Sequence, residues 1–313
     1  MTGPDLPTLL ASGERATFHG NPAAAVGALE QAVELAQATA LFAEAAAAGW
    51  LLGVALGAAG RYGQALTVLA PLVEAGSAEA VGAEQRLFGS LAGSTIASIQ
   101  RQLGRHAVAR EADLAALSLT TGSGEAAFDA LLGLASDAIG LDEGDEAAGR
   151  LQQAERALPG RGDEWWRQLV RLDWTRAELA LLEGSPEDAA VHASAAVQRA
   201  ENGRAPRHVA KGLLLLGIAQ VSGGLAEAAA LASRIREAVE AYEPGLLHPR
   251  LGALHLGVSI GMGCFPIDGS DFTGLLTAAD STMYREKTER KLGNLADPDR
   301  MHLGAEFGLP RAA

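Results

Sequence analysis

The sequence predicts a mainly α-helical fold, an α-α superhelix of about six helix pairs followed by a small C-terminal strand-turn-helix element. Three observations support this prediction. Alanine, leucine and glycine dominate the 313 residues and aromatic residues are only 4%, which favours helices that pack closely through small side chains. Glycines recur between helical patterns with a period near 40 residues. One segment near the C-terminus alternates apolar and small residues in the manner of a strand.

The repeat is marked by a glycine that separates two helix-like runs. These glycines follow one another at steps of 40, 44, 40, 40 and 40 residues and are Gly20, Gly60, Gly104, Gly144, Gly184 and Gly224. We expect each to adopt the left-handed conformation that ends the first helix of a pair. Asn21-Pro22 and Ser185-Pro186 then place a capping side chain and a proline at the start of the second helix. A small residue that allows close helix packing follows five positions after the glycine, at Ala25, Ala65, Ala109, Gly149, Ala189 and Ala229.

Two units share further residues that identify the type of repeat. In the second unit these are Trp50, Leu52, Gly53, Gly60, Tyr62 and Ala65, and in the sixth they are Leu216, Gly217, Gly224 and Ala229. Over about residues 6–242 the pattern resembles tetratricopeptide (TPR) repeats. Because the usual TPR unit has about 34 residues, the nearer likeness is to the long TPR-like repeats of bacterial signalling proteins. The resemblance implies a solenoid in which the first helix of each unit lines a concave groove.

Phasing on the turn glycines places nine polar or aromatic residues near that groove: Trp50, Ser94, Ser98, Arg101, Arg167, Arg171, Trp174, Glu178 and Lys211. The four between residues 167 and 178 are spaced 4, 3 and 4 apart, so they form one stripe on a helix. Such a mixture of arginine, tryptophan and an acid suits recognition of a peptide or a small ligand. The alternative is that Trp174 belongs to the core and the charges form a solvated face.

The strand-like segment begins at Leu254 and is apolar at every second position as far as Met262. Glycines at 257, 261 and 263 occupy its other face, which predicts that another backbone or helix comes close there. The residues from Pro266 to Gly269 indicate a turn. Ser270 or Asp271 then caps a helix whose apolar face is Leu275, Leu276, Ala279 and Met283.

The same region resembles the last strand and helix of a diguanylate cyclase (GGDEF) domain. The matching residues are Val258-Ser259-Ile260-Gly261, Pro266, Asp268-Gly269, Leu275-Leu276, Ala279-Asp280, Met283-Tyr284 and Lys287. The resemblance implies that Lys287 and Lys291 are vestiges of a phosphate-binding site. The metal-binding carboxylates and the signature turn of that family are not found before this segment. The nearest match, Glu143 to Ala147, falls on the turn of the fourth repeat, where we expect an acidic helix N-terminus and no catalytic role.

Charge and composition restrict the classes of function. The formal net charge is −13 and the pI is about 5.0, so a broad basic face for nucleic acid is not expected. Cys264 is the only cysteine and the seven histidines show no metal-ligand spacing, so we expect no metal and no cofactor. No signal peptide is apparent, and no apolar stretch approaches the ~20 residues that span a membrane. We therefore expect a cytoplasmic protein that does not bind membranes.

These observations predict a TPR-like domain over residues 1–242, a linker at 243–250, a degenerate cyclase fragment at 251–294 and a flexible tail at 295–313. The leading hypothesis is a non-enzymatic interaction or signal-sensing scaffold that binds a protein, a peptide or a small signal in its groove. Its C-terminal strand would be open to pairing with a second copy. The alternative is a cyclase-related protein that binds or makes a cyclic dinucleotide when another chain completes its tail.

Overall fold

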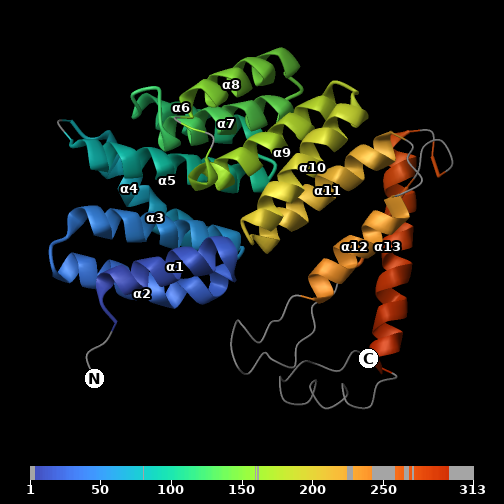
Figure 1. The fold of residues 1–313 in the computed structure, drawn as a ribbon, viewed down its shortest axis with the longest axis horizontal. Helices are drawn as coiled ribbons and strands as arrows, with labels where there is room; N and C mark the ends of the chain where they lie inside the picture. Colours follow the sequence, from blue (N-terminus) through green and yellow to red (C-terminus); the bar gives the residue numbers. More distant parts are fainter. Residues whose placement is uncertain are drawn as a thin grey trace. The chain divides into compact units, whose positions relative to one another are not determined.

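A computed structural model describes residues 4–79, 81–158, 160, 162–223, 228–241, 258–263, 268–269 and 271–295, with the backbone alone at 228–230 and 289–295. These residues form thirteen α-helices and one short 3-10 helix, and no strand is assigned among them. The chain is therefore mainly α-helical, as the sequence predicts (Figure 1). In chain order the elements are α1 (Leu6–His19), α2 (Pro22–Ala38), α3 (Phe42–Ala58), α4 (Tyr62–Ser77), α5 (Ala83–Gln102), α6 (His106–Ser118), α7 (Glu125–Gly140), α8 (Gly144–Ala157), η1 (Asp163–Trp165), α9 (Trp166–Leu182), α10 (Pro186–Asn202), α11 (Pro206–Ser222), α12 (Ala228–Glu240) and α13 (Phe272–Leu295).

The chain divides into two compact units, the first of which contains α1 to α11. Within it each helix packs against the next along the chain. The odd-numbered helices also contact one another in order, α1 with α3, α3 with α5, and so on to α11. The odd-numbered helices therefore form an inner layer and the even-numbered helices an outer layer, which is the arrangement of an α-α superhelix. No helix in the described part of the chain is both long and apolar enough to cross a membrane.

The turns between paired helices follow the predicted chemistry in three repeats. Gly60, Gly104 and Gly184 have φ angles of 75°, 72° and 72°, the left-handed conformation that glycine adopts without strain. In the fourth repeat Asp142 takes this position with φ 64°, and Gly144 is already the first residue of α8. The prediction for Gly144 is therefore wrong by two residues. Gly20 differs as well, with φ −135°, and Gly224 lies outside the described residues.

Small residues hold the helices of each pair close together. Four of the predicted contact residues, Ala25, Ala65, Ala109 and Ala189, are buried. In the fourth repeat the buried residue is Ala147, five positions after Asp142, whereas the predicted Gly149 is exposed. A second series, which the sequence analysis missed, lies on the inner helices at Gly13, Gly53, Gly93 and Gly133.

The helices meet at these inner glycines without room for a larger side chain. A Cβ added at Gly53 would lie 2.4 Å from Cδ2 of Leu69, and one at Gly13 would lie 2.4 Å from the same atom of Leu29. Both leucines are fully buried in the core shared by α2, α3, α4 and α5. The recurrence of glycine at these positions therefore has a steric cause, since a larger side chain would collide with the neighbouring helix at each crossing.

The second compact unit contains α12, the segment 258–263 and α13. The sequence analysis, by contrast, predicts a repeat domain that ends at residue 242 and so includes α12. Asp271 is one of the two residues predicted to cap α13. Its side chain accepts a hydrogen bond from the backbone N–H of Gly274 at 2.7 Å, so it is the cap. The strand predicted from Leu254 is not assigned within 258–263, and residues 254–257 lie outside the described residues, as do 243–250 and 296–313.

The segment 258–263 packs against α13. A Cβ on Gly261 would lie 1.8 Å from the carbonyl oxygen of Ala279, and one on Gly263 would lie 2.6 Å from that of Leu275. The prediction that another backbone approaches these glycines is therefore confirmed. The N–H of Ile260 donates to Glu286 at 3.1 Å and the N–H of Met262 to Thr282 at 3.2 Å. Side chains of α13 thus bind the backbone of this segment.

Candidate functional site

The candidate site is a hollow of about 700 Å³ on the inner layer of the first unit, here called the inner hollow. It is lined by residues of every odd-numbered helix from α1 to α11. All nine residues that the sequence analysis assigns to the groove lie along its wall: Trp50, Ser94, Ser98, Arg101, Arg167, Arg171, Trp174, Glu178 and Lys211. Their convergence follows from the fold, because inner helices of successive repeats present the same face to a common centre.

The stripe on α9 forms ion pairs with its neighbours. Arg167 and Arg171 both pair with Asp129 of α7, Arg167 at 3.7 Å, and Arg167 also pairs with Glu125. Glu178 pairs with Lys211 of α11 at 3.1 Å. These charges therefore join α7, α9 and α11 across the inner layer.

Trp174 is both part of the core and part of the wall. It is 9% exposed, and the His208 ring stacks on it with centroids 5.3 Å apart and an interplanar angle of 16°. The Lys211 ammonium lies 4.7 Å from the centroid of the Trp174 ring, which is cation–π geometry. Trp50, the other predicted aromatic residue, donates from Nε1 to the hydroxyl of Thr95 at 3.2 Å.

The guanidinium of Arg101 is paired with two buried carboxylates. It bonds Asp113 of α6 and lies 3.1 Å from Asp137 of α7, and both carboxylates are 0% exposed. Burial alone would lower the pKa of Arg101, but the two carboxylates raise it. Burial raises the pKa of Asp113 to about 7, against the opposing effect of Arg101. Arg101 therefore joins α5, α6 and α7 through these two ion pairs.

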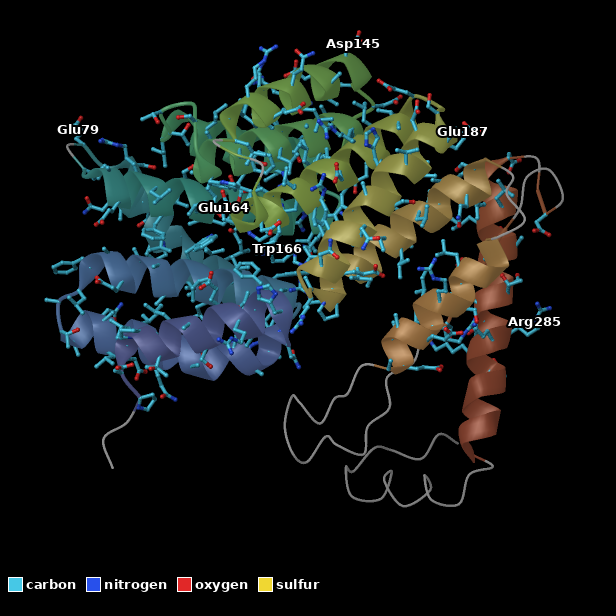
Figure 2. The ribbon with its side chains drawn as sticks, viewed as in Figure 1. Glu79, Asp145, Glu164, Trp166, Glu187 and Arg285 are labelled. Atoms are coloured by element: carbon cyan, nitrogen blue, oxygen red, sulfur yellow. The ribbon has the colours of Figure 1, made fainter. Side chains whose placement is uncertain are left out.

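The inner layer closes where α1 meets α11. His19 hydrogen bonds through Nδ1 to the carbonyl oxygen of Gly203 at 2.8 Å, and its ring lies 5.2 Å from that of Trp166. Arg207 donates to the carbonyl oxygen of Thr17 at 3.4 Å. Figure 2 labels Trp166 at this junction, at the start of α9. Figure 1 shows α11 beside α1, although the residues that bond there are about 190 positions apart in the sequence.

The closure adds wall residues that the sequence analysis missed. Phe18 of α1 lies under the Arg167 guanidinium at 5.2 Å, and Arg207 and His208 come from α11. Burial lowers the pKa of His208 to about 3, and the cations Arg207, Arg167 and Arg171 lower it further. The imidazole is therefore neutral at physiological pH. Arg207 lies one 40-residue period after Arg167, so the repeat could have indicated it. Phe18 joins the wall because the superhelix brings α1 and α11 together.

The Glu143 turn, where no catalytic role is expected, does not line the hollow. Glu143, Asp145 and Glu146 form the start of α8, and Glu143 is paired with Arg110. This acidic helix N-terminus agrees with the interpretation of that turn. Lys287 is exposed on α13, and the side chain of Lys291 lies outside the described residues. No cluster of three or more potential metal ligands occurs among the residues that the structure describes.

Comparison with known proteins does not assign a family. No family model matches the sequence, and no curated protein matches it. Among solved structures, the chain is similar to BtubC (BKLC) from P. vanneervenii, with 15% sequence identity and a TM-score of 0.47. The alignment covers 82% of this chain and 95% of that one.

Proposed function

We propose that this protein is a non-enzymatic TPR-like scaffold of the bacterial signalling type, and that its inner hollow receives a ligand or partner. The observation that supports the proposal is the convergence of all six inner helices of the first unit on one hollow. Its wall combines half-buried aromatic side chains with ion-paired cations, a composition typical of recognition sites. The phased repeats and the cyclase-like C-terminal segment are the sequence features that favour a signalling role in the cytoplasm.

The test is partner capture with a matched pair of surface variants. Lys211→Glu reverses a charge in the hollow, at a side chain that is 46% exposed and lies beside Glu178. Arg86→Glu makes the same change on the exposed face of α5, outside the hollow. We expect partners captured by cross-linking to be lost with Lys211→Glu and kept with Arg86→Glu. An identical set of partners for both variants would contradict a role of the hollow.

A second candidate is binding or synthesis of a cyclic dinucleotide. It is favoured by the exposed Lys287 on α13 and by the segment 258–263 that packs on the same helix. Incubation of the pure protein with GTP and Mn²⁺, followed by mass spectrometry for the cyclic product, separates the two candidates. The first proposal predicts no product, and clear turnover would replace it with the second.

A further inference from the structure

The charges around the inner hollow cancel one another. The basic side chains that line it are Arg101, Arg167, Arg171, Arg207 and Lys211. The carboxylates in ion pairs with them are Asp113, Asp137, Glu125, Asp129 and Glu178. Arg207 donates to a backbone oxygen, that of Thr17. Five formal positive charges thus meet five formal negative charges, so the wall favours neither an anion nor a cation.

The paired side chains still have hydrogen-bonding capacity for a ligand. Asp129 and Glu178 line the hollow beside the cations with which they pair. A charged ligand would compete with a partner that is already in place, and a buried ion deprived of its partner is strongly destabilising. A ligand hydroxyl has one donor and two acceptor lone pairs, so it can bond the carboxylate and the cation of one pair together. Uncharged hydroxyl groups therefore suit this wall without separating any pair.

Hydroxyl groups of the protein extend the same polar surface. Those that line the hollow come from α5, α7 and α9 and belong to Ser94, Thr95, Ser98, Ser136 and Thr175. Ser136 and Thr175 each donate to a carbonyl oxygen of their own helix at 3.1 Å, and their own oxygens are 3.5 Å apart. Because each proton is used on the backbone, these two oxygens offer lone pairs. They can accept hydrogen bonds from the hydroxyl groups of a ligand.

Another part of the wall is apolar. Phe18 of α1 and Trp50 and Val54 of α3 line the hollow, and each is half-buried. A ligand that reached both parts would place hydroxyl groups against α5, α7 and α9 and an apolar face against α1 and α3. A pyranose ring has this character, since its hydroxyl groups lie at the rim and its C–H groups cover the faces. Burial of those C–H groups on the aromatic side chains would be favourable.

The size and closure of the hollow favour a compact ligand. Its volume of about 700 Å³ lies within the ~300–1,000 Å³ of small-molecule sites. A protein partner of standard size would need roughly 800 Å² of its own surface in contact. The contacts of His19 and Arg207 join the first inner helix to the last, so the wall runs round the hollow instead of forming a trough open along one side.

We propose that the inner hollow binds an uncharged sugar of one or two rings, free or as a glycoside. The proposal rests on the proposed function, since it names the class of ligand that the hollow receives. The hydroxyl groups of the sugar bond the ion pairs of Asp129 and Glu178 and the hydroxyls of Ser136 and Thr175. The apolar face of the sugar, or the aglycone of a glycoside, covers Phe18, Trp50 and Val54.

Calorimetric titration of the full chain tests this proposal with matched probes. Phenyl β-glucoside, phenyl β-galactoside and maltose are the neutral sugars, phenyl β-glucuronide is the anion, and 2-phenoxytetrahydropyran is a neutral ring without hydroxyl groups. We expect at least one neutral sugar to bind with a Kd of about 1 mM or tighter, an affinity reasonable for its size. The glucuronide and the hydroxyl-free ring should each bind at least about tenfold more weakly than that sugar. Raised ionic strength should leave the binding of the sugar unchanged.

Matched serine variants locate the site. Ser98→Ala and Ser136→Ala each remove a hydroxyl from the wall, whereas Ser118→Ala removes an exposed hydroxyl of α6, outside the hollow. We expect each hollow variant to weaken sugar binding about threefold to tenfold and Ser118→Ala to have no effect. Circular dichroism of the three variants should match that of wild type, because alanine is a good helix former.

Three results would overturn the proposal. In the first, no neutral sugar reaches a Kd of about 1 mM. In the second, the glucuronide or the hydroxyl-free ring binds within about tenfold of the tightest sugar. In the third, neither hollow variant weakens binding. Partner capture that depends on Lys211, without sugar binding, would leave the proposed function in place and refute only this inference.

Discussion

Asp113 provides the sharpest quantitative prediction, because its carboxylate is 0% exposed and its pKa is raised to about 7 from an ordinary 3.8. The perturbation is Asp113→Asn, which keeps the shape of the side chain and removes its titration. Burial is the main cause of the raised pKa, and Arg101 opposes it without cancelling it. Burial also raises the pKa of Asp137, the second carboxylate that is paired with Arg101.

The sign of the effect follows from the proton balance. The unfolded chain releases the Asp113 proton near pH 3.8, whereas the folded protein keeps it until about pH 7. The unfolded state therefore binds fewer protons in this window, and the free energy of unfolding falls as the pH rises. At about 1.4 kcal/mol per pKa unit, the loss between about pH 4 and pH 7.5 is roughly 3–4 kcal/mol. Asparagine does not titrate, so the Asp113→Asn variant should not show this loss of stability.

Urea unfolding followed by circular dichroism measures the difference. We expect the unfolding free energy of Asp113→Asn minus that of wild type to rise by roughly 3–4 kcal/mol from about pH 4 to pH 7.5. Asp145→Asn is the control, since Asp145 is an exposed carboxylate in the first turn of α8. Its difference from wild type should change far less. A difference for Asp113→Asn that is flat across this range would refute the assignment of a buried, protonatable carboxyl at this position.

Two further predictions concern the repeat itself. Gly53→Ala should lower the free energy of unfolding by about 1–3 kcal/mol, because the new Cβ would lie 2.4 Å from the buried Leu69. Gly27→Ala, in α2 with no atom within 4 Å, should instead raise it by up to about 1 kcal/mol; equal effects in urea unfolding would contradict the steric account. Asp142→Gly should raise the thermal midpoint, because Asp142 has φ 64° where other repeats have glycine. A lower midpoint would show that the aspartate side chain contributes more than the backbone strain costs.

The helical fold and the members of the hollow could be predicted because both depend on local periodicity. Glycine positions fix the phase of each helix pair, and helical spacing fixes which side chains share a face. Arg171, Trp174 and Lys211, which are far from Trp50 in sequence, line the same hollow for this reason. The fourth repeat departs from the prediction because Gly144 keeps the 40-residue period, whereas the left-handed turn residue lies two positions earlier. Only the backbone geometry shows that Asp142 replaces the glycine there.

Long-range partners could not be predicted from periodicity. Arg101 has the phase of a groove residue, yet its guanidinium bonds carboxylates 12 and 36 residues away. The closure between α1 and α11 depends on the small rotation at each repeat, added over the whole first unit. A single sequence contains no measure of that rotation. Phe18 and His208 therefore became wall residues only in the folded chain.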